Sequence, residues 1–153
     1  MRTLIGLLLG AIAFTALAAS GDNSIGTWKL NMAKSKFTPD APVKSLTTTR
    51  EATSGGVKIT TTGEMADGSP LNASAAAKYD GSESAATGAP WDTMTIKQVD
   101  ANTFTGTSRK KDGKYRSTSR TVISKDGKTM TVTSKGANAE GKPFNYVLVY
   151  DKQ

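Results

Sequence analysis

Residues 103–133 read TFTGTSRKKDGKYRSTSRTVISKDGKTMTVT, and this stretch decides the fold. Three runs rich in threonine and serine are separated by two Asp-Gly pairs, Asp112-Gly113 and Asp126-Gly127. Asp-Gly is typical of hairpin turns, because both residues tolerate the positive φ that tight turns require. The stretch therefore predicts three antiparallel strands joined by two-residue loops.

The positions of the two turns predict which side chains share a face of the sheet. A loop at Asp112-Gly113 sets Arg109 opposite Arg116, and a loop at Asp126-Gly127 sets Ile123 opposite Met130. Side chains alternate between faces along a strand, so one face becomes apolar and the other polar. The apolar face holds Phe104, Tyr115, Ile123, Met130 and Val132. The polar face holds Arg109, Arg116, Arg120, Thr105, Thr118, Thr131 and Thr133.

The same alternation of strands and turn signals extends over most of the chain. Further Asp-Gly pairs occur at 67–68 and 80–81, and all five prolines fall at expected breaks between strands. We predict strands near 25–30, 43–53, 57–65, 71–79, 83–87, 92–99, 103–111, 114–124, 128–136 and 144–151. Asn31 to Phe37 is expected to form a short helix or a turn. Ala73 to Ala77 has helical propensity, but the hairpin signal at Asp80-Gly81 favours a strand.

A meander of so many strands leaves exposed edges unless its first and last strands pair. The sequence therefore predicts a single all-β domain, an up-and-down antiparallel β-barrel of about eight to ten strands. Small residues on the apolar face leave room for a ligand inside: Gly106, Ser108, Ser117, Ser119 and Ser134. The alternative is a flattened barrel or sandwich that its own side chains fill. In the last strand, apolar residues lie on both faces, and Tyr146, Leu148 and Tyr150 are expected to point inward.

The N-terminus has the three parts of an export signal. Arg2 is followed by an apolar run from Leu4 to Leu17, and Ala16-Leu17-Ala18 supplies small residues before a cleavage site after Ala18 or Ala19. We predict a signal peptide over 1–19 and a barrel domain over 20–153, in the periplasm or secreted. The alternative, a membrane anchor, fits less well because the run falls short of the roughly 20 residues that span a bilayer. Stable membrane insertion of the cleaved protein is not expected.

The composition limits the chemistry that the domain can perform. The chain has no cysteine and no histidine, which removes thiol chemistry, the usual zinc sites and the commonest general base. Turn geometry accounts for five of the 13 acidic residues: Asp67, Asp80, Asp112, Asp126 and Glu140. The formal charge is +7, but the lysines are scattered and not interleaved with aromatic residues, so nucleic acid is not an expected partner. Neither an enzyme nor a metal or cofactor site is predicted, and the oligomeric state stays open.

Both ends of the domain resemble a known family. Gly26-Thr27-Trp28-Lys29-Leu30 resembles the first strand of the calycins, which include lipocalins and fatty-acid-binding proteins, where Gly-x-Trp opens the barrel. Residues 147–152 resemble the last strand of a fatty-acid-binding protein. Segments 26–31, 99–104, 124–133 and 149–153 also resemble exported, functionally uncharacterised bacterial lipocalin-like proteins.

The resemblance implies a binding barrel, with one departure. The fatty-acid-binding pattern holds a ligand carboxylate with an arginine and a tyrosine of the last strand; Tyr150 matches the tyrosine, but Leu148 replaces the arginine. A buried carboxylate needs a charged partner. We therefore expect a small apolar or uncharged ligand, in contact with Trp28, Phe104, Tyr115, Ile123, Met130, Val132, Tyr146 and Tyr150. The alternative function is a structural or interaction protein of the envelope with a filled barrel and no ligand.

The arginine cluster and Trp91 each have two interpretations. Arg109, Arg116 and Arg120 form either an anion or partner surface or a solvated outer face, because like charges opposite each other repel unless solvated or paired. Trp28 is expected to plug one end of the barrel. Trp91, beside Pro90, either lines the mouth of the barrel or caps it.

Overall fold

The computed structural model describes residues 21–153, and the expected signal peptide lies outside them. The described residues form eleven strands and no helix. The strands are β1 (Gly26–Leu30), β2 (Lys36–Thr38), β3 (Val43–Thr53), β4 (Gly56–Met65), β5 (Pro70–Lys78), β6 (Ser84–Thr87), β7 (Thr93–Asp100), β8 (Thr103–Arg109), β9 (Arg116–Ile123), β10 (Thr129–Ala137) and β11 (Pro143–Lys152).

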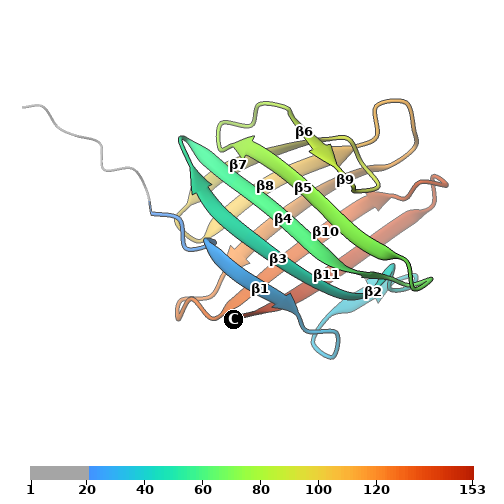
Figure 1. Cartoon of the computed structure of the whole chain (residues 1–153), viewed down its shortest axis with the longest axis horizontal. Helices are drawn as coiled ribbons and strands as arrows, with labels where there is room; N and C mark the ends of the chain where they lie inside the picture. Colours follow the sequence, from blue (N-terminus) through green and yellow to red (C-terminus); the bar gives the residue numbers. More distant parts are fainter. Residues whose placement is uncertain (1–20) are drawn as a thin grey trace, which may run out of the picture.

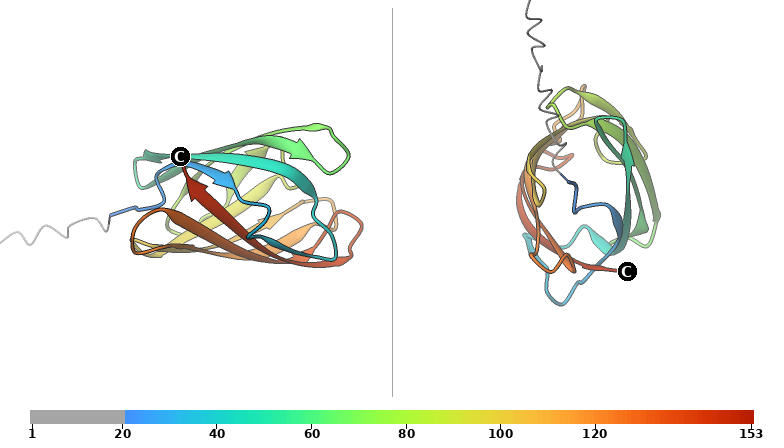
Figure 2. Two further views of the ribbon diagram at one scale, coloured as in Figure 1. Left: turned by 90° about the horizontal axis from the view of Figure 1, so that it is seen from below. Right: turned by 90° about the vertical axis from the view of Figure 1, so that its left-hand side faces the viewer.

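These strands close into a barrel (Figure 1). Each strand from β3 to β11 pairs antiparallel with the next, β3 also pairs with β1, and β1 pairs with β11 through Trp28 and Lys152. Figure 2 shows the resulting closed ring from one end. The short β2 lies on the same edge of β11 as β1, so the ring has ten strands and β2 extends it. The predicted up-and-down barrel is confirmed.

The predicted registers are correct, but the two hairpin loops are longer than predicted. Arg109 faces Arg116 and Ile123 faces Met130. Beyond that last pair, the Ser124 N–H donates to the Thr129 carbonyl at 2.9 Å, so the loop spans 125–128. A two-residue type I′ turn needs positive φ at both central residues. Within residues 21–153 only glycines have positive φ, so Asp126 does not adopt it, while Gly127 does at 72°. The loop at Asp112-Gly113 is longer than predicted in the same way, since the Lys110 N–H donates to the Tyr115 carbonyl at 2.9 Å and the loop spans 111–114.

One strand was missed and one ambiguous segment was assigned correctly. The expected helix or turn over Asn31 to Phe37 is a turn that leads into β2, so the helical alternative is wrong. Phe37 pairs with Tyr146 of β11, and their rings meet edge to face with centroids 5.5 Å apart. This contact with a distant strand stabilises a short segment that has no local strand signal. Ala73 to Ala77 lies in β5, as predicted, paired along its length with β4.

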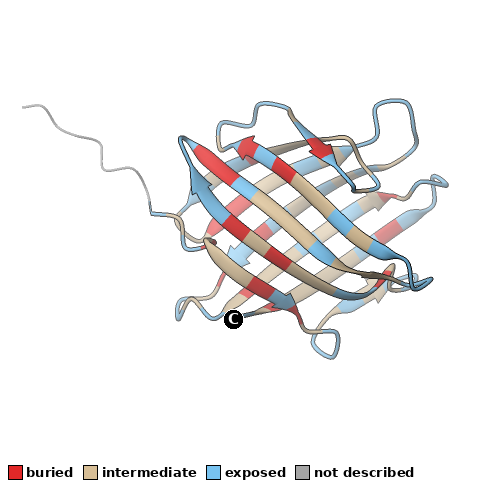
Figure 3. Cartoon of the chain, viewed as in Figure 1, coloured by how far each residue is buried: buried red, intermediate tan, exposed pale blue. Residues whose placement is uncertain are grey.

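Side chains of the inner face pack into two apolar clusters. The first gathers around Trp28 between β1, β3, β9, β10 and β11: Trp28, Leu30, Val43, Ile123, Met130 and Tyr150. The second lies between β4, β5, β7 and β8: Val57, Ala77, Ile96 and Phe104. Figure 3 shows how buried positions alternate with less buried ones along the strands that form the wall. Burial of these apolar side chains is the main favourable contribution to the free energy of folding. Residues 21–153 contain no disulfide that could add to it.

The two ends of the barrel differ. At one end, here called the floor, the segment 21–25 lies across the ring (Figure 2). The Asn23 N–H donates to the Ala101 carbonyl at 3.0 Å, and the Trp28 indole N–H donates to the Ser24 carbonyl at 2.8 Å. The expectation that Trp28 plugs one end is consistent with this position, fully buried at 0% exposure. The opposite end, here called the mouth, carries the loops that follow β8 and β10.

Candidate functional site

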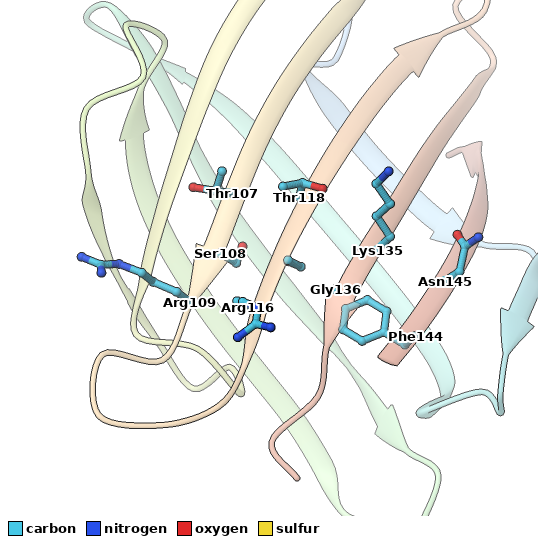
Figure 4. Close-up of a pocket in the computed structure, with 10 residues that line it drawn as sticks. Thr107, Ser108, Arg109, Arg116, Thr118, Lys135, Gly136, Phe144 and Asn145 are labelled. Atoms are coloured by element: carbon cyan, nitrogen blue, oxygen red, sulfur yellow. The ribbon is translucent and has the colours of Figure 1, made fainter. Parts of the chain in front are cut away.

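A pocket of about 760 Å³ opens where β8, β9, β10 and β11 approach the mouth. Its lining residues come from four neighbouring strands, and the Arg109 side chain points away from the others (Figure 4). They are Thr107, Ser108, Arg109, Arg116, Ser117, Thr118, Lys135, Gly136, Phe144 and Asn145. Binding pockets for small molecules commonly measure a few hundred to about 1,000 Å³, so the volume suits one.

The register explains why space is left at this point. Ser108 pairs with Ser117, Ser117 with Gly136, and Gly136 with Phe144, so one row across four strands carries three very small residues. One step closer to the floor, the row is Gly106, Ser119, Ser134 and Tyr146. Nearest the floor, Ile123, Met130 and Tyr150 fill the interior. Along β8, β9 and β10 the inner wall therefore changes from large and apolar near the floor to small and polar near the mouth, whereas β11 keeps aromatic rings at Tyr146 and Phe144.

Aromatic rings follow one another along the mouth and form the aromatic row: Trp91, Tyr115, Phe144, Tyr146 and Phe37. Trp91 stacks on Tyr115 at 5.2 Å between centroids, and Phe144 stacks on Tyr146 at 4.5 Å. Trp91 thus lines the mouth, one of its two expected positions. Burial raises the pKa of both Tyr115 and Tyr146, and the negative charge of Asp40 adds to the rise of the Tyr146 pKa. These neutral rings offer flat apolar surface beside the pocket.

The residues expected to contact a ligand all face the interior, but they separate into two groups. Trp28, Phe104, Ile123, Met130 and Tyr150 are buried in the floor clusters. Tyr115 and Tyr146 lie in the aromatic row, and Val132 is partly buried between the two levels. The pocket itself adds Ser108, Ser117, Gly136 and Phe144, of which Ser108 and Ser117 had been predicted to face inward. Phe144 shares the face of Tyr146, Leu148 and Tyr150, but it was not named as a site residue because Pro143 left the register of the last strand open.

Arg109, Arg116 and Arg120 lie on the outer face and are exposed, as their register predicted. Arg109 forms an ion pair with Glu83 at 2.7 Å. Exposed pairs of this kind contribute little to stability, about 0–1 kcal/mol. Arg109 and Arg116 border the pocket. Their side chains point to the outer face, whereas the neighbouring Ser108 and Ser117 belong to the inward row. Their role as an anion or partner surface stays a prediction.

The acidic residues of the turns are held by local hydrogen bonds. Asp67 accepts from the Ser69 hydroxyl at 2.6 Å, and Asp126 accepts from the Ser124 hydroxyl at 2.6 Å. These bonds, together with those from backbone N–H groups, lower the pKa of both carboxyls. Within residues 21–153, no three acidic, histidine or cysteine side chains gather where they could hold a metal ion. In the same region no helix is long and apolar enough to cross a bilayer.

The floor contains a polar network that sequence reasoning did not find. The Arg50 Nε donates to the Ser24 hydroxyl at 2.9 Å, and that hydroxyl donates to Asp22 at 2.6 Å. The Tyr79 hydroxyl donates to the other carboxylate oxygen of Asp22. Arg50 points inward because it shares the parity of Thr48, which pairs with Trp28 across β1 and β3. That signal depends on the pairing of β1 with β3, which the Asp-Gly turns do not specify.

Two tyrosines of the interior have strongly raised pKa values. Burial raises the pKa of Tyr150 to about 12. Burial and the hydrogen bond to Asp22 raise the pKa of Tyr79 to about 12. Both groups therefore stay neutral in the folded barrel at pH values where an unfolded tyrosine, with a pKa of about 10, has lost its proton.

This difference predicts a loss of stability in alkaline solution. Above about pH 10 the unfolded chain releases the Tyr150 proton while the folded chain keeps it, so the free energy of unfolding falls. The contribution of Tyr150 is fully present below pH 10 and is lost toward pH 12, by up to about 3 kcal/mol. Urea unfolding at several pH values should show this fall, and Tyr150→Phe should reduce it. An equal fall in both proteins would contradict the assignment to Tyr150.

Comparison with protein-family models and with curated proteins found no match. Among solved structures, the zebrafish ileal bile-acid-binding protein complexed with cholic acid matches with a TM-score of 0.52 and 13% sequence identity, over 86% of this chain and 100% of that one. The chain has the fold of this calycin. EF1p2_mFAP2b bound to DFHBI matches with a TM-score of 0.48 and 10% identity, over 86% of this chain and 94% of that one. The match to the bile-acid-binding protein confirms the expected fold, an antiparallel barrel like that of the fatty-acid-binding proteins.

Proposed function

We propose that this calycin-like barrel is an exported binding protein that holds a small, mainly apolar molecule in its interior. The observation that carries the proposal is the row of Ser108, Ser117 and Gly136, which leaves the pocket open beside the aromatic row. An apolar ligand placed there would cover the partly exposed rings of Tyr115 and Tyr146, which is favourable, while Phe144 is already only 6% exposed. The binding of cholic acid by the zebrafish protein of the same fold supports a ligand in this interior.

The proposed location is the periplasm or the extracellular medium. It rests on the signal-peptide pattern in residues 1–19, and the absence of cysteine means that the domain needs no oxidising enzyme to fold there. Mass spectrometry of the protein purified from its native cell envelope should give a chain that begins at Ala19 or Ser20. A chain that keeps Met1 to Leu17 would contradict export with cleavage.

A pocket-filling substitution tests the binding function. We expect the neutral fluorescent probe N-phenyl-1-naphthylamine to bind the unmodified protein, and Ser117→Phe to weaken binding at least about tenfold because the new ring occupies the pocket. Thr133→Phe places the same ring on the outer face, at an exposed position that does not line the pocket, and should change binding no more than about twofold. Native mass spectrometry of protein purified without denaturation should also show a co-purified small molecule. A clean apo mass together with no probe binding would contradict the proposal.

One observation favours the alternative, an envelope structural or interaction protein with a filled barrel. The cluster around Trp28 is extended toward the mouth by Phe37, Leu46, Met65, Val132 and Leu148, so side chains fill much of the interior along β1, β3 and β11. This alternative predicts that Ser117→Phe and Thr133→Phe behave alike toward the probe. The same measurement therefore separates the two functions.

A further inference from the structure

Arg50 is a buried cation with an unused hydrogen-bond donor. It is only 7% exposed on β3, and its guanidinium carbon lies 5.5 Å from the centroid of the Phe104 ring. Its Nε is satisfied by Ser24 at 2.9 Å. Its Nη2 is buried and has no hydrogen-bond partner among the described residues. A buried donor on a charged group is costly to leave unpaired, so such a group calls for an acceptor.

The charge of Arg50 is also incompletely balanced. Within residues 21–153 Arg50 forms no ion pair. The acid connected to it is Asp22, reached through Ser24, and both carboxylate oxygens of Asp22 are already engaged. One accepts from the Ser24 hydroxyl and N–H, and the other accepts from Tyr79. Nothing in the network places a negative charge against Nη2, and a buried cation without such a partner is unfavourable.

A small cavity begins at the strand that pairs with the Arg50 strand, although Arg50 itself is not among its lining residues. Ile59, the direct cross-strand partner of Arg50, lines a space of about 70 Å³ together with Thr61 and Met94. The same space reaches Trp91, at one end of the aromatic row. A water molecule occupies about 30 Å³ in the liquid, so the space is of the size of a carboxylate rather than of a whole ligand.

From these contacts we propose that Arg50 anchors an anionic group of the ligand, a carboxylate or a group of similar charge and size, with the apolar body of the ligand directed toward the aromatic row. The inference rests on the proposed binding function and specifies its ligand as a small amphipathic monoanion. The resembling fatty-acid-binding pattern places its arginine on the last strand, where this chain has Leu148. Here the cation comes from β3 instead, so the reason for expecting an uncharged ligand no longer holds.

Two fluorescent probes that differ in charge and by one methyl group test the inference: dansylaminoundecanoate and its methyl ester. The acid should bind the unmodified protein at least about tenfold more tightly than the ester, because only the acid can accept from the guanidinium. Arg50→Met should remove this preference by weakening the acid and leaving the ester within about twofold. Lys58→Met, which removes an exposed cation of the outer face that lines neither cavity, should leave both affinities within about twofold.

The outcomes separate this inference from the proposed function. Tight ester binding without a preference for the acid, or equal losses of both probes in Arg50→Met, would overturn the role of Arg50 and leave the binding barrel in place. Absence of binding by both probes would overturn both. Thermal unfolding followed by circular dichroism checks that the variants are folded.

A measurement on the unmodified protein covers the case in which Arg50→Met does not fold. Decanoate labelled with carbon-13 at its carboxyl group reports its own protonation by NMR. A carboxylate against Arg50 should keep its charge at a pH at which free decanoate is protonated, since an adjacent cation lowers a carboxyl pKa. The titratable groups that face this position through Ser24 are Asp22 and Tyr79. A bound decanoate that titrates at its free value would contradict the inference.

Discussion

Replacing Trp28 with alanine should lower the free energy of unfolding by about 3–5 kcal/mol, because it removes a large, fully buried side chain from the floor. The indole contributes more than volume. Its N–H donates to the Ser24 carbonyl at 2.8 Å, and Lys152 of the last strand lies 5.2 Å from the ring centroid. Trp28 therefore connects the first strand to the last strand and to the segment across the floor. The alanine variant loses both of these contacts together with the packing of the ring.

Urea unfolding followed by far-ultraviolet circular dichroism measures this effect without relying on tryptophan fluorescence. Trp91→Ala is the matched control, because Trp91 is the same residue type at the mouth, only partly buried and stacked on Tyr115. Its loss should cost about 1 kcal/mol. Equal costs for the two variants would contradict the assignment of Trp28 to the floor core.

Replacing Phe104 with alanine should cost a similar amount, about 3–5 kcal/mol, for a different reason. Phe104 is 2% exposed and belongs to the second cluster, where its ring meets Tyr79 at 5.2 Å between centroids. The same ring supports the guanidinium of Arg50. The alanine variant leaves a cavity and also exposes a buried cation to an empty space, and both effects destabilise the folded state.

Phe104→Leu separates these two effects, because leucine fills much of the volume without a π-face. It should cost about 1–2 kcal/mol in the same urea experiment. A cost below about 1 kcal/mol for Phe104→Ala would show that the second cluster is not a stabilising core.

The alternation of residues within each strand was the part of the fold that the sequence predicts well. The Asp-Gly turns set Arg109 against Arg116 and Ile123 against Met130, and both pairs are found. These pairings are local, since each joins two strands across one loop. The predicted loop length was wrong, because a two-residue and a four-residue loop give the same register and differ in the φ of residues such as Asp126.

Features that depend on distant pairings were not predicted. β2 exists because Phe37 meets Tyr146, and the two are far apart in the sequence. Arg50 faces the floor because β3 pairs with β1 and not only with β4. The aromatic row combines residues of β2, β11 and two loops, and no spacing in the sequence brings them together. The candidate site is therefore partly hidden from the sequence, although each of its strands is visible there.

The pairing of the first strand with the last has a consequence for the order of folding events. Trp28 pairs with Lys152, and Asn31 and Asp151 are joined by a 2.8 Å side-chain hydrogen bond between positions 120 apart in the chain. Contacts between such distant residues form slowly, because a long loop must close before they are made. During synthesis, β1 keeps an open edge until β11 has been made, so ring closure comes last. The nascent chain therefore cannot form the closed barrel until translation is nearly complete. This suits the proposed export, in which the chain crosses a membrane before it folds.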